Sequence, residues 1–478
     1  MTLTLGTPLV TEGIVAALAV LVLVTGLVRS GTDRAPSAAR TIAWITFVGL
    51  LGALATTFAA ADGSVFGGAY VVDGLALFAK RLVVGSAAIS VLASLSSPHG
   101  ALTRRAAEYH FTLLFSLLGM LVLVSARELI LLFVAFELMS IPLYVLTGFL
   151  KRDGAAPEAA LKFFVVGTVS AAVIAYGMSF MYGVMGTTLL AAVPAATAEA
   201  HPLMLLGLGL VLAGLGFKIA AFPFHMWAPD SYEAASTPFV AWLSVAPKAA
   251  GFVVIIRLYV EGAGPAALAW VPLLSMLAGV TIVAGNLMAI PQQNVKRLLA
   301  YSGVAHIGYM LIGLAAMSAD GVATVLFYLL AYVFGNMGAF LVVEAVARAG
   351  HSNSLDAYRG LAQRSPLLAL AMLLFLLSLG GIPFVAGFWA KLYVFLAGVE
   401  RGLLGLVFVG AVLTVVALYY YLLVARRMYI EPPPEATPVP VSPSLGITIA
   451  VCVLGVVGIG VYPGPWLDVA RRIASTLF

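Results

Sequence analysis

The chain has 478 residues, of which 62% are hydrophobic and only 9% are Asp, Glu, Lys or Arg. Soluble domains carry about 25% charged residues, so this composition excludes a soluble globular protein, whose surface would need many more polar groups. The net charge of +5 comes from scattered basic residues and not from one patch, which argues against a nucleic-acid partner.

Long apolar runs follow one another along the whole chain and predict an all-α polytopic membrane protein. A membrane-spanning helix needs about 20 mostly apolar residues. The runs are apolar on every side, whereas the strands of a membrane β-barrel would alternate apolar and polar residues. We expect about fourteen transmembrane helices, at approximate residues 8–28, 41–60, 72–96, 106–124, 127–149, 159–185, 203–223, 234–260, 266–289, 298–316, 322–347, 366–399, 402–425 and 444–463.

Lysine and arginine are unevenly divided between alternate loops. One set of loops and loop ends holds 15 of them and the other set holds 5. Basic residues gather on the cytoplasmic side of membrane proteins, so the richer set is predicted to be cytoplasmic. Both termini are then predicted to lie on the opposite side of the membrane.

Five basic residues lie within the predicted spans, namely Lys80, Arg81, Lys218, Lys248 and Lys391. Ionisable groups inside a membrane are costly and mark functional sites. Three of these lysines, together with Glu137, stand near mid-span or beside a helix break and are the candidate functional residues. Lys80 and Arg81 lie nearer a helix end, so for them we expect snorkelling toward the interface, or a structural or subunit-facing role.

Prolines and glycines interrupt the apolar runs beside the same lysines. Pro223 follows Lys218, Pro247 directly precedes Lys248, and Pro383 precedes Lys391. Proline removes a helical hydrogen bond, and in lipid such a break survives only where protein or a water-filled cavity satisfies the freed groups. Broken helices beside ionisable residues are typical of ion-translocating proteins.

The two strongest breaks fall in the seventh and twelfth predicted helices, five helices apart. Because five is odd, a second copy of a five-helix unit would insert upside down. We therefore predict two inverted repeats, helices 4–8 and 9–13, with broken helices 7 and 12. The corresponding regions are residues 1–105 for helices 1–3, 106–262 and 263–430 for the repeats, and 431–478 for a proline-rich linker and the last helix.

The chain offers little for binding a cofactor. Its one cysteine, Cys452, is too few for an iron–sulfur cluster, and no nucleotide-binding fingerprint is present. We expect neither a cofactor nor a metal on this chain.

Three stretches resemble the antiporter-like membrane subunits of respiratory complex I, the NADH-quinone oxidoreductase. They are KIAAFPFHMWAPDSYEAASTPFVAWLSVAPKAAGF (218–252), VKRLLAYSGVAHIGYM (295–310) and GGIPFVAGFWAKLYVF (380–395). Within the first, SYE followed by SVAPKAA is more similar to the subunit N type than to its paralogues L and M. The resemblance covers essentially the whole chain. Phe384 departs from it, because the family often has a second proline there.

The resemblance implies a proton relay. Glu137 would pair with Lys218, Lys248 would be the connecting residue at the membrane centre, and Lys391 would be the terminal relay on the exit side. His306 would join the hydrated central axis, or else be a hydrogen-bonded packing residue. His225 would line the cytoplasmic access route, or else cap a helix end.

The resemblance also implies partners and cofactors elsewhere. The partners would be the antiporter-like M and L subunits and the small J and K subunits, within the lipid bilayer. NAD, FMN, iron–sulfur clusters and quinone would sit in partner subunits. Two alternatives stay open, a subunit of a multisubunit cation/proton antiporter and the equivalent subunit of a ferredoxin-dependent or hydrogenase-type complex. A purely structural scaffold is a third possibility.

Overall fold

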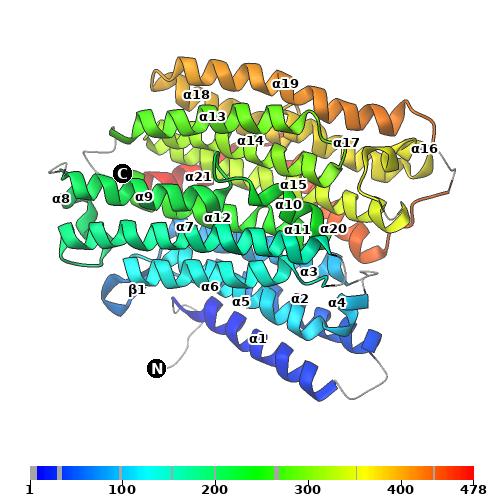
Figure 1. Cartoon of the computed structure of the whole chain (residues 1–478), viewed down its shortest axis with the longest axis horizontal. Coiled ribbons are helices and arrows are strands. Elements are labelled where there is room, and N and C mark those ends of the chain that lie inside the picture. Colours follow the sequence, from blue (N-terminus) through cyan, green and yellow to red (C-terminus); the bar gives the residue numbers. More distant parts are fainter. Residues whose placement is uncertain are drawn as a thin grey trace. The chain divides into compact units, whose positions relative to one another are not determined.

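The computed structural model describes residues 8–29, 35–95, 100–151, 154–198, 201–262, 269–350, 352–433 and 437–478. Among these residues, 13 helices are long and apolar enough to cross a membrane. The chain divides into an N-terminal unit (Met1–Ile219 and Ala234–Ala267) and a C-terminal unit (Ala220–Glu233 and Leu268–Phe478), and helices dominate both (Figure 1). The predicted all-α membrane fold is confirmed. A helix suits lipid because it satisfies its backbone groups internally.

The N-terminal unit begins with α1 and ends with the π-helical turn η3. Asp73 caps α3 by accepting a hydrogen bond from the backbone N–H of Ala76, and Glu128 caps α6 in the same way. Its helices are α1 (Val10–Arg29), α2 (Ala35–Ala59), α3 (Gly74–Ser94), α4 (Gly100–Arg104), α5 (Ala106–Ser125), α6 (Leu129–Thr147), α7 (Ala155–Met185), η2 (Leu190–Ala192), α8 (Val193–Ala198), α9 (Pro202–Ile219), α11 (Thr237–Leu243), α12 (Ala246–Ile255) and η3 (Ile256–Glu261).

A small antiparallel hairpin precedes α3. Strands β1 (Gly63–Val65) and β2 (Tyr70–Val72) pair around the short helix η1 (Phe66–Gly68). Tyr70 and Val72 are buried against Leu77 of α3. The sequence did not indicate this hairpin, because each strand has only three residues.

The C-terminal unit contains most of α10 and everything from α13 onward. Helix α21 is amphipathic and was not predicted. It buries Leu467 and Ala470, and its Arg471 lies 3.3 Å from Asp320 of α15. The helices of this unit are α10 (Trp227–Ala234), α13 (Val271–Ala289), α14 (Val295–Ala315), α15 (Ala319–Gly350), η5 (Leu355–Tyr358), α16 (Leu361–Arg364), α17 (Pro366–Gly380), α18 (Ala386–Glu400), α19 (Leu404–Tyr429), α20 (Pro443–Val461), α21 (Gly464–Ala474) and η6 (Ser475–Leu477).

The helix breaks occur where the prolines predict them. Helix α9 ends at Ile219, before Pro223, and α17 ends at Gly380, before Pro383. The predicted twelfth span is thus two shorter helices, α17 and α18, each of 15 residues. The predicted eighth span is also divided, because Ser244 and Val245 separate α11 from α12.

Each break brings one lysine close to a helix end. Lys218 lies in the last turn of α9, Lys248 in the first turn of α12, and Lys391 in the second turn of α18. The inverted relation of helices 4–8 and 9–13, and the four regions drawn from it, stay predictions.

Candidate functional site

Lys218 is enclosed by side chains of α6 and α7. Only 1% of it is exposed, and its Nζ donates a hydrogen bond to the Ser140 hydroxyl over 2.7 Å. The same atom lies 5.2 Å from the ring centre of Phe136 and 6.0 Å from those of Tyr144 and Phe163. Aromatic faces attract a cation, so this cage can hold the ammonium form without a direct carboxylate partner.

Glu137 lies on α6 and interacts electrostatically with Lys218. Its Oε1 is buried without a hydrogen-bond partner, and no ion pair within 4.0 Å joins it to Lys218 among the described residues. The acid expected to pair with Lys218 is therefore a neighbour held at more than contact distance.

Lys248 lies in the N-terminal unit with Lys218. It is 1% exposed and follows Pro247 in the first turn of α12, which packs against α9. One turn later, a Cβ added to Gly251 would lie 3.9 Å from Cγ of Lys218. The same Cβ would come within 2.8 Å of Cγ2 of Ile219, so the absence of a side chain at Gly251 lets α12 pack against the residue that follows Lys218.

Lys391 lies in the C-terminal unit at the break between α17 and α18. Its Nζ donates to the carbonyl oxygen of Gly380 over 3.2 Å and lies 4.7 Å from the centre of the Tyr309 ring. The last carbonyls of a helix lack intrahelical donors and carry partial negative charge, which favours an ammonium there. Gly381 ends α17 with φ +83°, and a Cβ at this position would come within 2.9 Å of Cδ of Lys391.

His306 of α14 is hydrogen-bonded through both ring nitrogens. Nδ1 lies 2.7 Å from the Tyr328 hydroxyl, and Nε2 lies 3.2 Å from the Tyr421 hydroxyl. The hydroxyl of Tyr421 also bonds to that of Ser302. The His306 ring packs edge-on against Tyr309, with 6.1 Å between centroids. Tyr309 therefore separates His306 from Lys391.

The polar cluster continues beyond Tyr309. The amide Nδ2 of Asn286 in α13 lies 3.4 Å from the Tyr309 hydroxyl, and its Oδ1 accepts a 3.0 Å hydrogen bond from Tyr420. Sequence reasoning missed these tyrosines and the asparagine. They come from four helices and share no motif, so their meeting could not be read from spacing.

His225 lies in the turn after α9. Its Nε2 is 3.4 Å from the sulfur of Met288, and its ring stacks on Phe222 with 5.4 Å between centroids. His225 is therefore a buried histidine that contacts a thioether and an aromatic ring, and no described contact joins it to one of the three lysines.

Two of the motifs behind the family resemblance meet in a charged cluster of the C-terminal unit. Arg297 of α14 lies 2.7 Å from Asp230 and 2.8 Å from Glu233, both of α10. Asn294, which caps α14, donates to Glu233 over 3.0 Å. This cluster joins the SYE and VKR stretches, which are about 60 residues apart in the chain.

Of the two roles expected for Lys80, snorkelling is wrong, and the contacts agree with the structural role. It is 1% exposed and forms a 2.9 Å ion pair with Glu12 of α1, and it also donates to the Tyr70 hydroxyl over 2.9 Å. Glu12 of the first helix is thus the buried counter-charge of Lys80. The sequence pattern did not reveal this pair, because the two residues are 68 positions apart in the chain. Arg81 instead donates to the carbonyl oxygen of Thr57 over 2.8 Å, which is a structural role.

Directly before α3, Asp73 neutralises another buried cation. It pairs with Arg257 at 2.8 Å and with Arg127 at 2.9 Å. Burial alone would raise the pKa of Asp73, but Arg257 and Arg127 outweigh it and lower that pKa to about 2. This carboxylate is thus a fixed charge at neutral pH.

The groups gathered in the two units have one chemical property in common, which is an exchangeable proton. Amines, a carboxylate, an imidazole and hydroxyls hold and pass protons. No group of three or more His, Cys, Asp or Glu side chains that could bind a metal ion occurs in the described part of the chain.

A family model, relatives in sequence and solved structures all relate this chain to the same group of proteins. The family model described as NADH:quinone oxidoreductase/Mrp antiporter, TM, matches residues 126–417. NADH-quinone oxidoreductase subunit N of Heliobacterium modesticaldum is 41% identical over 98% of this chain and 99% of its own length. A chain of respiratory complex I from Thermus thermophilus is 33% identical with a TM-score of 0.81, covering 96% of this chain and 98% of that one.

A chain of the Mrp complex from Dietzia has a TM-score of 0.85 over 98% of this chain and 97% of its own, but it is only 19% identical and shares the fold alone. The subunit N relative, in contrast, is similar in sequence from end to end. The chain therefore belongs to the NADH:quinone oxidoreductase/Mrp antiporter transmembrane family, and within it to the proteins called NADH-quinone oxidoreductase subunit N.

Proposed function

We propose that this chain is a proton-translocating membrane-arm subunit of an NADH-quinone oxidoreductase and performs no redox chemistry itself. The observation that carries the proposal is the burial of Lys218, Lys248 and Lys391, each at most 3% exposed and each beside a helix break. Ionisable groups in such places are functional by default.

The relay that we propose begins with Glu137 and Lys218, continues to Lys248, and ends at Lys391. A buried lysine can release its proton, whereas arginine stays charged in proteins. The cage around Lys218 stabilises its ammonium form, and the charge of Glu137 adds to this stabilisation from beyond contact distance. A change in the charge or position of Glu137 would alter the proton affinity of Lys218.

In the C-terminal unit, we assign His306 to the relay together with its hydroxyl partners. Its two ring nitrogens are bonded to two tyrosine hydroxyls, so one can accept a proton while the other donates one. Tyr309, which lies between His306 and Lys391, has its hydroxyl near Asn286. For His225 we propose only that it borders the cytoplasmic access route.

Electron transfer would take place in partner subunits that hold NAD, FMN, iron–sulfur clusters and quinone. The membrane partners that we propose are the M, L, J and K types. The chain would reside in the inner membrane of a bacterium with both termini in the periplasm. A cation/proton antiporter subunit would instead show sodium- or potassium-dependent transport in the purified assembly, which separates that alternative from ours.

The decisive experiment compares a buried pair with an exposed pair. Glu137→Gln and Lys218→Ala, each made singly in the intact complex, should reduce the number of protons pumped per electron, with Lys218→Ala the more severe. Glu158→Gln and Lys162→Ala are matched controls, because this pair is an exposed ion pair on α7 with a 2.8 Å separation. The controls should pump normally, since exposed ion pairs contribute little.

Proton-to-electron ratios are measured in reconstituted vesicles, with assembly checked by the amount of complex recovered. Normal ratios in both buried-site variants would remove Glu137 and Lys218 from the relay.

A further inference from the structure

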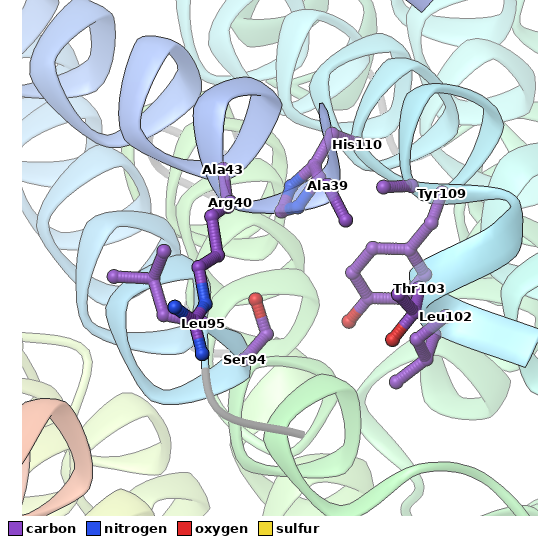
Figure 2. Close-up of a pocket in the computed structure, with 10 residues that line it drawn as sticks. Ala39, Arg40, Ala43, Ser94, Leu95, Leu102, Thr103, Tyr109 and His110 are labelled. Atoms are coloured by element: carbon purple, nitrogen blue, oxygen red, sulfur yellow. The ribbon is translucent and has the colours of Figure 1, made fainter. Parts of the chain in front are cut away.

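A cavity of about 240 Å³ lies among α2, α3, α4 and α5 in the N-terminal unit, away from the proposed relay residues. Figure 2 shows the polar groups that line it, which are the guanidinium of Arg40, the hydroxyls of Ser94, Thr103 and Tyr109, and the imidazole of His110. Ala39 and Ala43 form part of the wall, and their small side chains leave the space open.

Two of these groups are buried although they are polar. Tyr109 is 2% and His110 is 3% exposed, and the Nδ1 atom of His110 has no hydrogen-bond partner among the described residues. A buried polar atom without a partner costs about 1–3 kcal/mol, so such an atom facing a cavity points to a ligand.

The charge around the cavity is positive. Arg40 is exposed and forms no ion pair in the described ranges, and Arg104 and Arg105 are exposed directly beside Thr103. One acidic residue, Glu108, is near in sequence, but it is exposed and does not line the cavity. An anion is therefore favoured over a cation. The excess of basic residues predicts that this end of the unit is cytoplasmic.

An exposed apolar stripe runs down α2 from the cavity. Trp44, Val48 and Leu51 are 49%, 60% and 44% exposed. They follow Arg40 at spacings of four, eight and eleven residues, which places all four on one face of the helix. A molecule with a charged head at Arg40 would thus have apolar surface directly beneath it.

We propose that this cavity binds the phosphodiester headgroup of an anionic membrane phospholipid. Guanidinium groups bind phosphate oxygens through paired charge-assisted hydrogen bonds. The hydroxyls of Tyr109 and Thr103 and the imidazole of His110 supply further donors. The cavity is too small for acyl chains, which would lie along Trp44, Val48 and Leu51. Basic pockets between transmembrane helices on the cytoplasmic side bind lipid headgroups in this way.

The test uses the intact complex, delipidated in mild detergent and then supplied with phosphatidylglycerol or phosphatidylcholine. Native mass spectrometry counts the lipids retained on this chain. We expect one tightly held phosphatidylglycerol per chain and roughly tenfold weaker retention in Arg40→Gln, since charge-assisted hydrogen bonds are the strong ones. Lys151→Gln is the matched control, because Lys151 is exposed and does not line the cavity.

A second variant, Ala39→Leu, fills the cavity without changing a charge and should also weaken retention. The assay needs no turnover, so its result is independent of proton pumping. Equal retention of the two lipids, or unchanged retention in both cavity variants, would overturn the proposal. Displacement of the bound lipid by inorganic phosphate alone would also overturn it, by identifying a site for a free anion.

Discussion

At the scale of the residue, the choice of lysine at position 391 separates a relay from a fixed charge. Lys391→Arg keeps a cation that can still bond to the carbonyl of Gly380 and stack on Tyr309, but guanidinium does not release its proton. We therefore expect Lys391→Arg to pump protons as poorly as Lys391→Ala in reconstituted vesicles, with normal assembly.

Lys162→Arg serves as the control for this substitution, because Lys162 is exposed and its pairing with Glu158 needs only a positive charge. It should pump normally. If Lys391→Arg also pumps like the wild type, Lys391 contributes only a fixed positive charge. The exit proton then passes through water or another side chain.

Single residues also show where sequence reasoning ends. The burial of Lys218 and Lys391 could be predicted, because each is a lone charge beside a proline within an apolar run. The aromatic cage of Lys218 and the tyrosine contacts of His306 could not be predicted. Aromatic residues in a membrane helix have no distinctive spacing, and whether they face a lysine or lipid depends on helix packing.

At the scale of the element, the end of α17 fixes the position of Lys391. Gly381 has φ +83°, and any Cβ there would press on the Lys391 stem. Gly381→Ala should therefore cost about 1–2 kcal/mol of backbone strain and also displace the lysine. The expected result is a lower thermal midpoint of the complex together with reduced proton pumping.

Gly402→Ala provides the matched control for this strain. Gly402, between α18 and α19, has a similar φ of +74°, but a Cβ there would meet nothing within 4 Å. It should lower the thermal midpoint by a similar amount and leave pumping intact. Equal loss of pumping in the two variants would mean that backbone strain, and not contact with Lys391, is responsible.

Prolines made the two helix breaks predictable from the sequence, whereas the short hairpin and the last amphipathic helix have no comparable sequence signal. The ends of α9 and α17 agree with Pro223 and Pro383, because proline cannot donate the next helical hydrogen bond. The β1–β2 hairpin was missed because strands of three residues are too short to show an alternating apolar and polar pattern. The amphipathic α21 was missed because its helical periodicity covers only 11 residues after the last span.

At the scale of the whole molecule, each compact unit contains a buried lysine next to a helix break. Lys218 occupies this place in the N-terminal unit and Lys391 in the C-terminal unit. The segment after the first break, Ala220–Glu233, belongs to the C-terminal unit. The inverted relation of two related halves stays a prediction from the number of helices between the two breaks.

The orientation of the chain can be tested with its single cysteine. Cys452 is fully buried, so an unmodified chain should react little with a membrane-impermeant thiol reagent. The uneven division of lysine and arginine predicts that Thr476 faces the periplasm and Lys151 the cytoplasm, and both are exposed.

In spheroplasts, Thr476→Cys should be labelled at once, and Lys151→Cys only after the membrane is opened. Wild-type protein controls for Cys452. Labelling in the reverse order would mean that the chain is inverted, and prompt labelling of both would mean that the number of predicted spans between them is wrong by one.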